Sequence, residues 1–157
     1  MHYYFAYGSN MDLEQMKKRC PGSVLLGKAV LKDYRIAFSI FSDLRKCGCA
    51  DIQCVPGSEV WGLLYRISDS DLDALDEYEG HPVHYRRISC SVTDETGVVR
   101  NVETYEVVNK NAEHLPPSEE YLGIMVHAAE KFSFPGAYQS FLRGFSSGSP
   151  ERLSEVS

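Results

Sequence analysis

Two short stretches of the sequence carry groups that could do chemistry. The first is the turn Gly8-Ser9-Asn10, which lies between an apolar, aromatic segment and a predicted helix. A glycine turn before a helix brings together backbone N–H groups that can bind a carboxylate or a phosphate. The second is an acidic run over residues 69–79, which ends at Glu79, just before a glycine. Small residues also form simple connections between strands and helices, so the turn alone does not establish a binding site.

Glu79 differs from the other acidic residues of its run by its position on the predicted helix. At helical spacing it falls on the side shared with Leu72 and Leu75, whereas most of the other carboxylates form a solvated face. A carboxylate directed toward the core is costly unless it is hydrogen-bonded, and burial raises its pKa. Glu79 is therefore a candidate general base, and a structural carboxylate that caps a loop is the alternative.

Apolar runs and turn residues predict the elements that must position these groups. The expected strands cover residues 4–7, 23–41 as two strands with a break near 32–33, 47–55, 59–67, 83–93 and 98–108. The expected helices follow the Gly8 turn, end near Gly80, run from 117 to about 132, and run from about 136 to 145. Consecutive strands without helices between them indicate an α+β domain. We expect a small mixed β-barrel of about six or seven strands flanked by three or four helices, because closure removes exposed sheet edges.

Length and composition indicate one ordinary globular domain. We place it at residues 1–145 of the 157, followed by a polar tail over residues 146–157. No apolar run approaches the roughly 20 residues of a membrane span, and the N-terminus lacks the features of a signal peptide, so we expect a cytoplasmic protein without a membrane partner. The net charge of −6 and the scattered basic residues argue against a nucleic-acid partner and favour a small molecule. The sequence leaves the oligomeric state open between a monomer and a homodimer.

Other chemistries find less support in the sequence. An odd number of cysteines, five, without a secretory signal does not predict a disulfide framework. Cys47, Cys49 and Cys54 lack a second Cys or His pair at the spacing of a structural zinc site, so we interpret them as buried free thiols and expect no metal or other cofactor. There is no H-E-x-x-H pattern and no phosphate-binding G-x-x-x-x-G-K-[ST] loop.

An ordered set of motifs resembles the γ-glutamylcyclotransferase family. In chain order the motifs are Tyr7-Gly8-Ser9-Asn10, Pro56-Gly57 with Glu59-Val60-Trp61-Gly62, Leu75-Asp76-Glu77-Tyr78-Glu79-Gly80, Tyr85, and Pro116-Pro117-Ser118 with Tyr121. Each motif is modest alone, but the set spans about residues 3–125 in the family's order. The resemblance implies a small β-barrel flanked by helices. It also implies that Gly8, Ser9 and Asn10 lie beside the substrate and that Glu79 is catalytic.

The resemblance implies cyclisation of a γ-glutamyl compound, in which the α-amine attacks the γ-carbonyl and releases 5-oxoproline and an amine or amino acid. Both reacting groups belong to one molecule, so neither a protein nucleophile nor a metal is required. Glu79 would act as base and then as acid. The N–H groups of the Gly8 turn would hold the α-carboxylate or the developing oxyanion, and Tyr7, Tyr85 and Tyr121 would line the pocket.

Several alternatives stay open at this point. A carboxylate-binding module of the same fold would keep the turn but do no chemistry, and the cysteines could instead serve a metal or a redox reaction. Members of the family act on γ-glutamyl amino acids, γ-glutamyl amines, glutathione or a carrier-bound γ-glutamyl group. The leaving group is therefore not fixed by the motifs.

Overall fold

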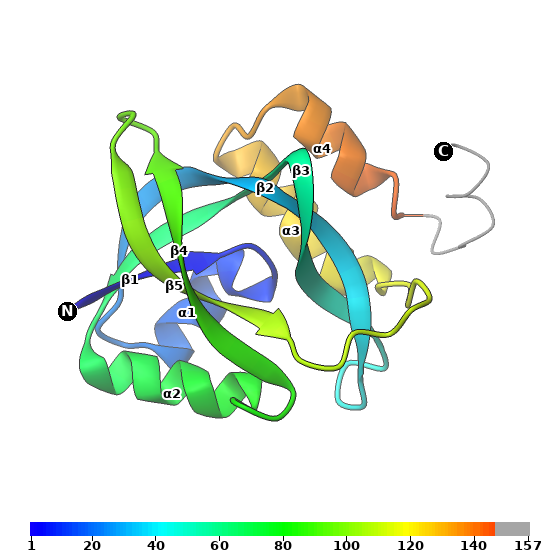
Figure 1. Cartoon of the computed structure of the whole chain (residues 1–157), viewed down its shortest axis with the longest axis horizontal. Helices are drawn as coiled ribbons and strands as arrows, with labels where there is room; N and C mark the ends of the chain where they lie inside the picture. The colour runs from blue at the N-terminus through cyan, green and yellow to red at the C-terminus, as the bar shows by residue number, and fades with distance from the viewer. Residues whose placement is uncertain (147–157) are drawn as a thin grey trace.

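The largest element of the fold is a long antiparallel hairpin made of β2 (Val24–Ser42) and β3 (Cys47–Ile67). It belongs to a computed structural model that describes residues 1–146. The other strands are β1 (His2–Ala6), β4 (Tyr85–Asp94) and β5 (Val99–Val107). They close a mixed barrel in the order β1-β3-β2-β4-β5, in which β1 meets β5 in parallel at Tyr4 and Glu103 (Figure 1). The α+β class and the barrel are as predicted.

The predicted number of strands was too high because two bends were interpreted as strand ends. Asp33 and Gly57 have φ angles of 67° and 87°, and the pairing register shifts between Lys32 and Tyr34. The Gly57 amide donates a hydrogen bond of 2.9 Å to Asp33 Oδ1, so the two bends face each other across the hairpin. Turn-forming residues here curve two continuous strands instead of ending four short ones. The barrel accordingly has five strands.

Helices cover the barrel on two sides. A short 3₁₀ helix η1 (Ser9–Met11) leads into α1 (Leu13–Arg19), and α2 (Asp69–Glu79) lies beside α1. The other pair, α3 (Glu119–Lys131) and α4 (Gly136–Arg143), packs together on another side of the barrel (Figure 1). The four helices agree with the predicted number.

Both ends of α2 are fixed by its own sequence. Ser68 Oγ accepts a hydrogen bond from the Asp71 amide at 3.1 Å, and the Asp71 carboxylate accepts one from the Ser68 amide at 3.3 Å. This reciprocal capping begins the helix. Gly80 ends it with a left-handed φ of 66°, which a glycine adopts without strain. The predicted end of the helix at Gly80 is confirmed, and Glu79 is its last residue.

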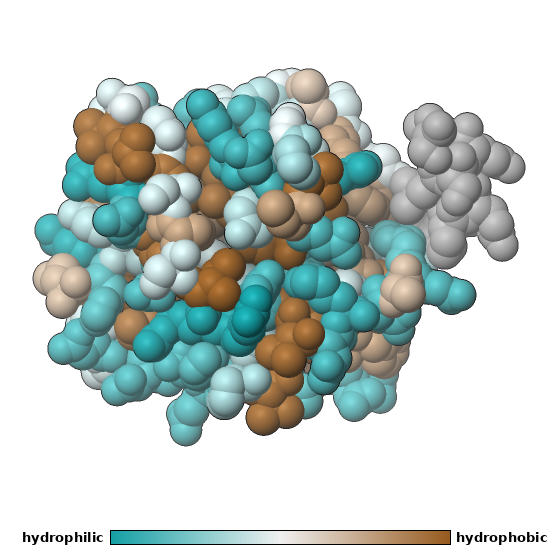
Figure 2. Space-filling view, viewed as in Figure 1, coloured by the Kyte–Doolittle hydropathy of each residue, from teal (hydrophilic) through white to brown (hydrophobic). Residues whose placement is uncertain are grey.

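The cysteine prediction is confirmed only in part. Cys47 and Cys49 are buried free thiols, whereas Cys54 is exposed. The face of the molecule seen in Figure 2 is mostly hydrophilic, with separate apolar patches. In the described part of the chain no helix is long and apolar enough to cross a membrane. The predicted tail over 146–157 lies, apart from Ser146, outside the described residues.

Candidate active site

A cavity of about 410 Å³ opens where β1 passes into η1, where α2 ends and where the β2–β3 hairpin turns. Its volume is in the range of small-molecule sites. The structure brings all seven predicted site residues to its lining: Tyr7, Gly8, Ser9, Asn10, Glu79, Tyr85 and Tyr121. These residues come from segments that lie far apart in the sequence, so the barrel is what assembles them.

Glu79 is the acidic group of this cavity with a strongly shifted proton affinity. The residue is partly exposed, as a group lining an open pocket must be. Burial of the carboxyl group raises its pKa to about 7, and the guanidinium groups of Arg19 and Arg45 act in the opposite direction. Among residues 1–146 the Glu79 carboxylate forms no ion pair. A carboxyl group of this kind can accept and return a proton near neutral pH.

The last turns of α2 are clamped onto the barrel by Asp76. Its Oδ1 accepts a hydrogen bond of 2.7 Å from the Tyr105 hydroxyl, and its Oδ2 pairs with Arg87 Nη1 at 2.8 Å. Leu75, beside Asp76, is fully buried. The clamp therefore holds the C-terminal part of α2, which ends at Glu79, against the barrel.

The space around Gly8 leaves little room for a side chain. A Cβ atom added to Gly8 would lie 3.1 Å from the Tyr121 hydroxyl oxygen and 3.4 Å from Ala50 Cβ. The turn therefore passes close to Tyr121, and any side chain at this position would fill the gap between the turn and the Tyr121 hydroxyl.

The side chains of Ser9 and Asn10 hold the turn in place. Asn10 Oδ1 accepts hydrogen bonds from Gln15 Nε2 at 2.9 Å and from Arg19 Nη1 at 3.1 Å, and Asn10 Nδ2 donates to the Tyr4 hydroxyl at 3.0 Å. Ser9 Oγ accepts a second bond of 2.9 Å from Gln15 Nε2. Because these side chains are engaged within the protein, the turn presents mainly its backbone to a ligand.

Three tyrosines, Tyr7, Tyr85 and Tyr121, form a wall of the pocket close to the turn, and their hydroxyls are hydrogen-bonded to the backbone. The Tyr85 hydroxyl donates to the Ala50 carbonyl at 2.7 Å, and the Tyr121 hydroxyl accepts from the Ala50 amide at 3.0 Å. The Tyr7 hydroxyl donates to the Tyr105 carbonyl at 2.6 Å. Burial is the main cause that holds the pKa values of Tyr7, Tyr85 and Tyr121 above the usual range, so these hydroxyls stay neutral.

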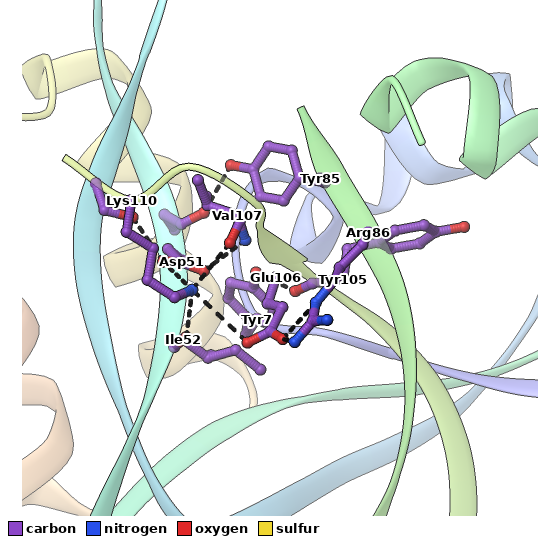
Figure 3. Close-up of polar contacts among 11 residues, drawn as sticks. Tyr7, Asp51, Ile52, Tyr85, Arg86, Tyr105, Glu106, Val107 and Lys110 are labelled. Atoms are coloured by element: carbon purple, nitrogen blue, oxygen red, sulfur yellow. Dashed lines mark hydrogen bonds and ion pairs between the residues drawn. The ribbon is translucent and has the colours of Figure 1, made fainter. Parts of the chain in front are cut away.

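A buried ionic network fixes the strand behind that wall. The Asp51 carboxylate accepts hydrogen bonds from Ser39 Oγ at 2.6 Å, from the Val107 amide at 2.8 Å and from Lys110 Nζ at 2.7 Å (Figure 3). Asp51 directly follows Ala50, whose amide and carbonyl bind the two tyrosines. The network therefore sets the position of the Ala50 backbone and, through it, of the tyrosine wall.

The sequence analysis missed the two cationic residues of the pocket, Arg19 and Arg45. Arg19 is the last residue of α1, and its guanidinium lies 4.6 Å from the centre of the Tyr78 ring. Arg45 comes from the turn between β2 and β3. A basic residue at a helix end gives a weak signal, and no local pattern distinguishes Arg45 from the other charges of its loop.

Comparison with known proteins gives three findings. Residues 59–142 match the model of the AIG2-like family. Two proteins named gamma-glutamylcyclotransferase, from Mus musculus and Homo sapiens, are 34% and 33% identical over 145 residues, and each alignment covers 89% of this chain and 76% of the relative. A solved structure named gamma-glutamyl cyclotransferase matches with a TM-score of 0.83 at 32% identity, over 90% of this chain and 86% of that one.

Proposed function

The chain belongs to the γ-glutamylcyclotransferase family and is an enzyme of that type, and we propose that it cyclises a small γ-glutamyl compound with Glu79 as the proton carrier. In this reaction the α-nitrogen of the glutamyl group forms a bond to its own γ-carbon. The bond between that carbon and the leaving nitrogen then breaks, which gives 5-oxoproline and a free amine.

The observation that carries the proposal is the Glu79 carboxyl group with a pKa of about 7 inside the pocket. The attacking amine starts as an ammonium ion, so a base must take a proton before the nitrogen can attack. Breakage of the C–N bond requires a proton on the leaving nitrogen. The two nitrogens lie on the same carbon in the tetrahedral intermediate, so one carboxyl group beside them can receive the first proton and deliver it to the second.

The other charges of the reaction have suitable partners in the pocket. The backbone N–H groups of the Gly8 turn and the hydroxyl of Tyr121 would bind the γ-carbonyl oxygen as it becomes negative. Donors aimed in advance at such an oxygen can contribute ~3 kcal/mol in the transition state. The Arg19 guanidinium, which is bonded to Asn10 beside this turn, would bind the α-carboxylate and fix the fold of the flexible glutamyl chain.

A thiolate-based function is less well supported by the site. Cys49 lines the cavity, but burial raises the pKa of its thiol to about 11. The nucleophilic and metal-binding form of cysteine is the thiolate, which this environment disfavours at neutral pH.

The test is an assay of 5-oxoproline release from γ-glutamyl amino acids, γ-glutamyl amines and glutathione, with and without excess chelator. We expect turnover of at least one of these compounds, unchanged by the chelator, because the proposed steps use only a carboxyl group and hydrogen-bond donors. Binding of the compounds without any 5-oxoproline would indicate a non-catalytic binding module. Turnover that is lost on chelation and restored by zinc would point to the cysteines instead.

A further inference from the structure

We propose that Asp51 is a positioning residue for the cyclisation, which fixes the Ala50 backbone so that Tyr121 presents a proton donor and Tyr85 a proton acceptor to the substrate. The inference rests on the proposed cyclisation and adds to it a fully buried carboxylate behind the lining of the pocket. It follows from the direction of the hydrogen bonds at Ala50 and from the contacts that hold Asp51 (Figure 3).

The two tyrosines bonded to Ala50 present opposite polarity to the pocket. The Tyr85 hydroxyl donates its proton to the Ala50 carbonyl at 2.7 Å, so toward a ligand its oxygen acts as an acceptor. The Tyr121 hydroxyl accepts from the Ala50 amide at 3.0 Å, so its own proton remains to be donated. The Cys49 thiol beside this hydroxyl is only a weak acceptor, and an oxygen that becomes negative would take its place.

This polarity suits the two charged positions of the reaction. The γ-carbonyl oxygen becomes negative as the ring closes, and the Tyr121 hydroxyl is a donor close to the Gly8 turn. The α-ammonium group needs acceptors, and the Tyr85 oxygen provides one in addition to Glu79. A displaced Ala50 backbone would misdirect both hydroxyls at once, and small errors of alignment are costly for a reacting group.

Asp51 holds this backbone from the position that follows Ala50. Its Oδ1 accepts from the Val107 amide at the end of β5, and its Oδ2 accepts from Ser39 Oγ on β2 and from Lys110 Nζ. An asparagine of the same size has one acceptor oxygen and two N–H donors, so it could not accept all three bonds. The carboxylate therefore joins three segments of the chain at one point behind the tyrosines.

Lys110 supplies the compensating charge and connects the pair to Tyr121. Its Nζ also donates to the carbonyls of Ile52 at 3.3 Å and Val107 at 3.1 Å. Lys110 lies in the connection between β5 and α3, and Tyr121 is in the first turn of α3. The ion pair therefore links the segment that carries Tyr121 to the backbone that its hydroxyl binds. Removing either partner leaves a buried group unmatched, so the two residues should act as a unit.

The experiment measures kcat and KM for 5-oxoproline release, per folded molecule, in Asp51→Asn and in Asp94→Asn. Asp94 is a matched control, because its carboxylate also accepts from two backbone amides, at 2.9 and 3.0 Å, and from Arg100, at 3.1 Å, but lies outside the lining of the pocket. Asp51→Asn should lower kcat by about 10- to 100-fold, because the Tyr121 bond strengthens as the oxygen becomes negative. KM should change by less than about fivefold, and Asp94→Asn should keep the wild-type kcat.

Two further variants test the same network without depending on Asp51→Asn alone. Ser39→Ala removes one donor to the carboxylate and should lower kcat by about 3- to 10-fold, again with a small change in KM. Asp51→Asn combined with Lys110→Met should have a kcat within about threefold of the slower single variant, because partners that act as a unit are not additive.

Three results would overturn the role of Asp51. The first is a wild-type kcat in Asp51→Asn, or in Ser39→Ala if Asp51→Asn does not fold. The second is a loss confined to KM, and the third is an equal loss of kcat in Asp94→Asn, because lower stability would then explain both variants. The wild type releases 5-oxoproline in each of these cases, so the cyclisation would stand. Absence of 5-oxoproline from every γ-glutamyl compound with the wild type would refute the cyclisation and, with it, the role of Asp51.

Discussion

The raised pKa of Glu79 predicts that this residue lowers the stability of the fold at neutral and alkaline pH. Its carboxyl pKa moves from a usual value near 4.5 to about 7 in the folded protein. Between these values the folded state binds more protons than the unfolded state, so stability falls as pH rises. A change of this size corresponds to about 3 kcal/mol, and access of solvent to the open pocket reduces the expected effect to about 1–3 kcal/mol.

Glu79→Gln removes this ionisation and should therefore be more stable than the wild type at high pH. We expect the difference in unfolding free energy to be about 1–3 kcal/mol at pH 8 and less than about 1 kcal/mol at pH 5, where Glu79 is protonated in the folded state. Urea denaturation of both proteins at the two pH values measures it. Glu77→Gln, an exposed position on the same helix, should show no such pH dependence. The raised pKa would be refuted if Glu79→Gln and the wild type differed in unfolding free energy by the same amount at both pH values. It would also be refuted if the variant were less stable than the wild type. Either result would indicate that Glu79 is a structural carboxylate.

Two further substitutions test the surroundings of Glu79. Gly8→Ala places a Cβ atom 3.1 Å from the Tyr121 hydroxyl oxygen and should reduce kcat/KM by about 10-fold or more. Gly123→Ala, where the added atom meets open space, should not reduce it. Equal activities of the two variants would refute the close approach of the substrate to the turn. Arg19→Met removes a cation that lowers the pKa of Glu79, so the acidic limb of the pH profile of kcat/KM should shift from near pH 7 to higher pH. An unchanged midpoint would show that the charge of Arg19 does not act on the Glu79 carboxyl group.

The fold was predictable where the sequence signals are local. The capping residues of α2 and its Gly80 end predicted the bounds of that helix, and apolar runs separated by turn residues predicted the strand regions. The number of strands was not predictable, because Asp33 and Gly57 are residues that commonly end strands. Only the pairing of β2 with β3 across both bends shows that the strands continue, and that pairing joins residues far apart in the sequence.

The candidate site was also predictable only where its residues carry a local sequence signal. Gly8 and Glu79 stand at the boundaries of their elements, where a helix begins or ends, and this made them visible as candidates. Arg19 and Arg45 reach the pocket only because the barrel brings α1 and the β2–β3 turn to the same end. The shift in the pKa of Glu79 likewise depends on burial by these distant segments.

The most direct test of the proposed mechanism is the rate of 5-oxoproline release by Glu79→Gln at saturating substrate, measured together with substrate binding on the same preparation. If Glu79 carries the proton, the rate per folded molecule should fall by roughly 10²- to 10⁴-fold or more while binding is largely retained. Glu77→Gln should keep a rate close to that of the wild type, because Glu77 is exposed at the edge of the pocket and the proposed steps do not use it. A Glu79→Gln enzyme that binds and turns over substrate at nearly the wild-type rate would contradict the assignment of Glu79 as the acid and base.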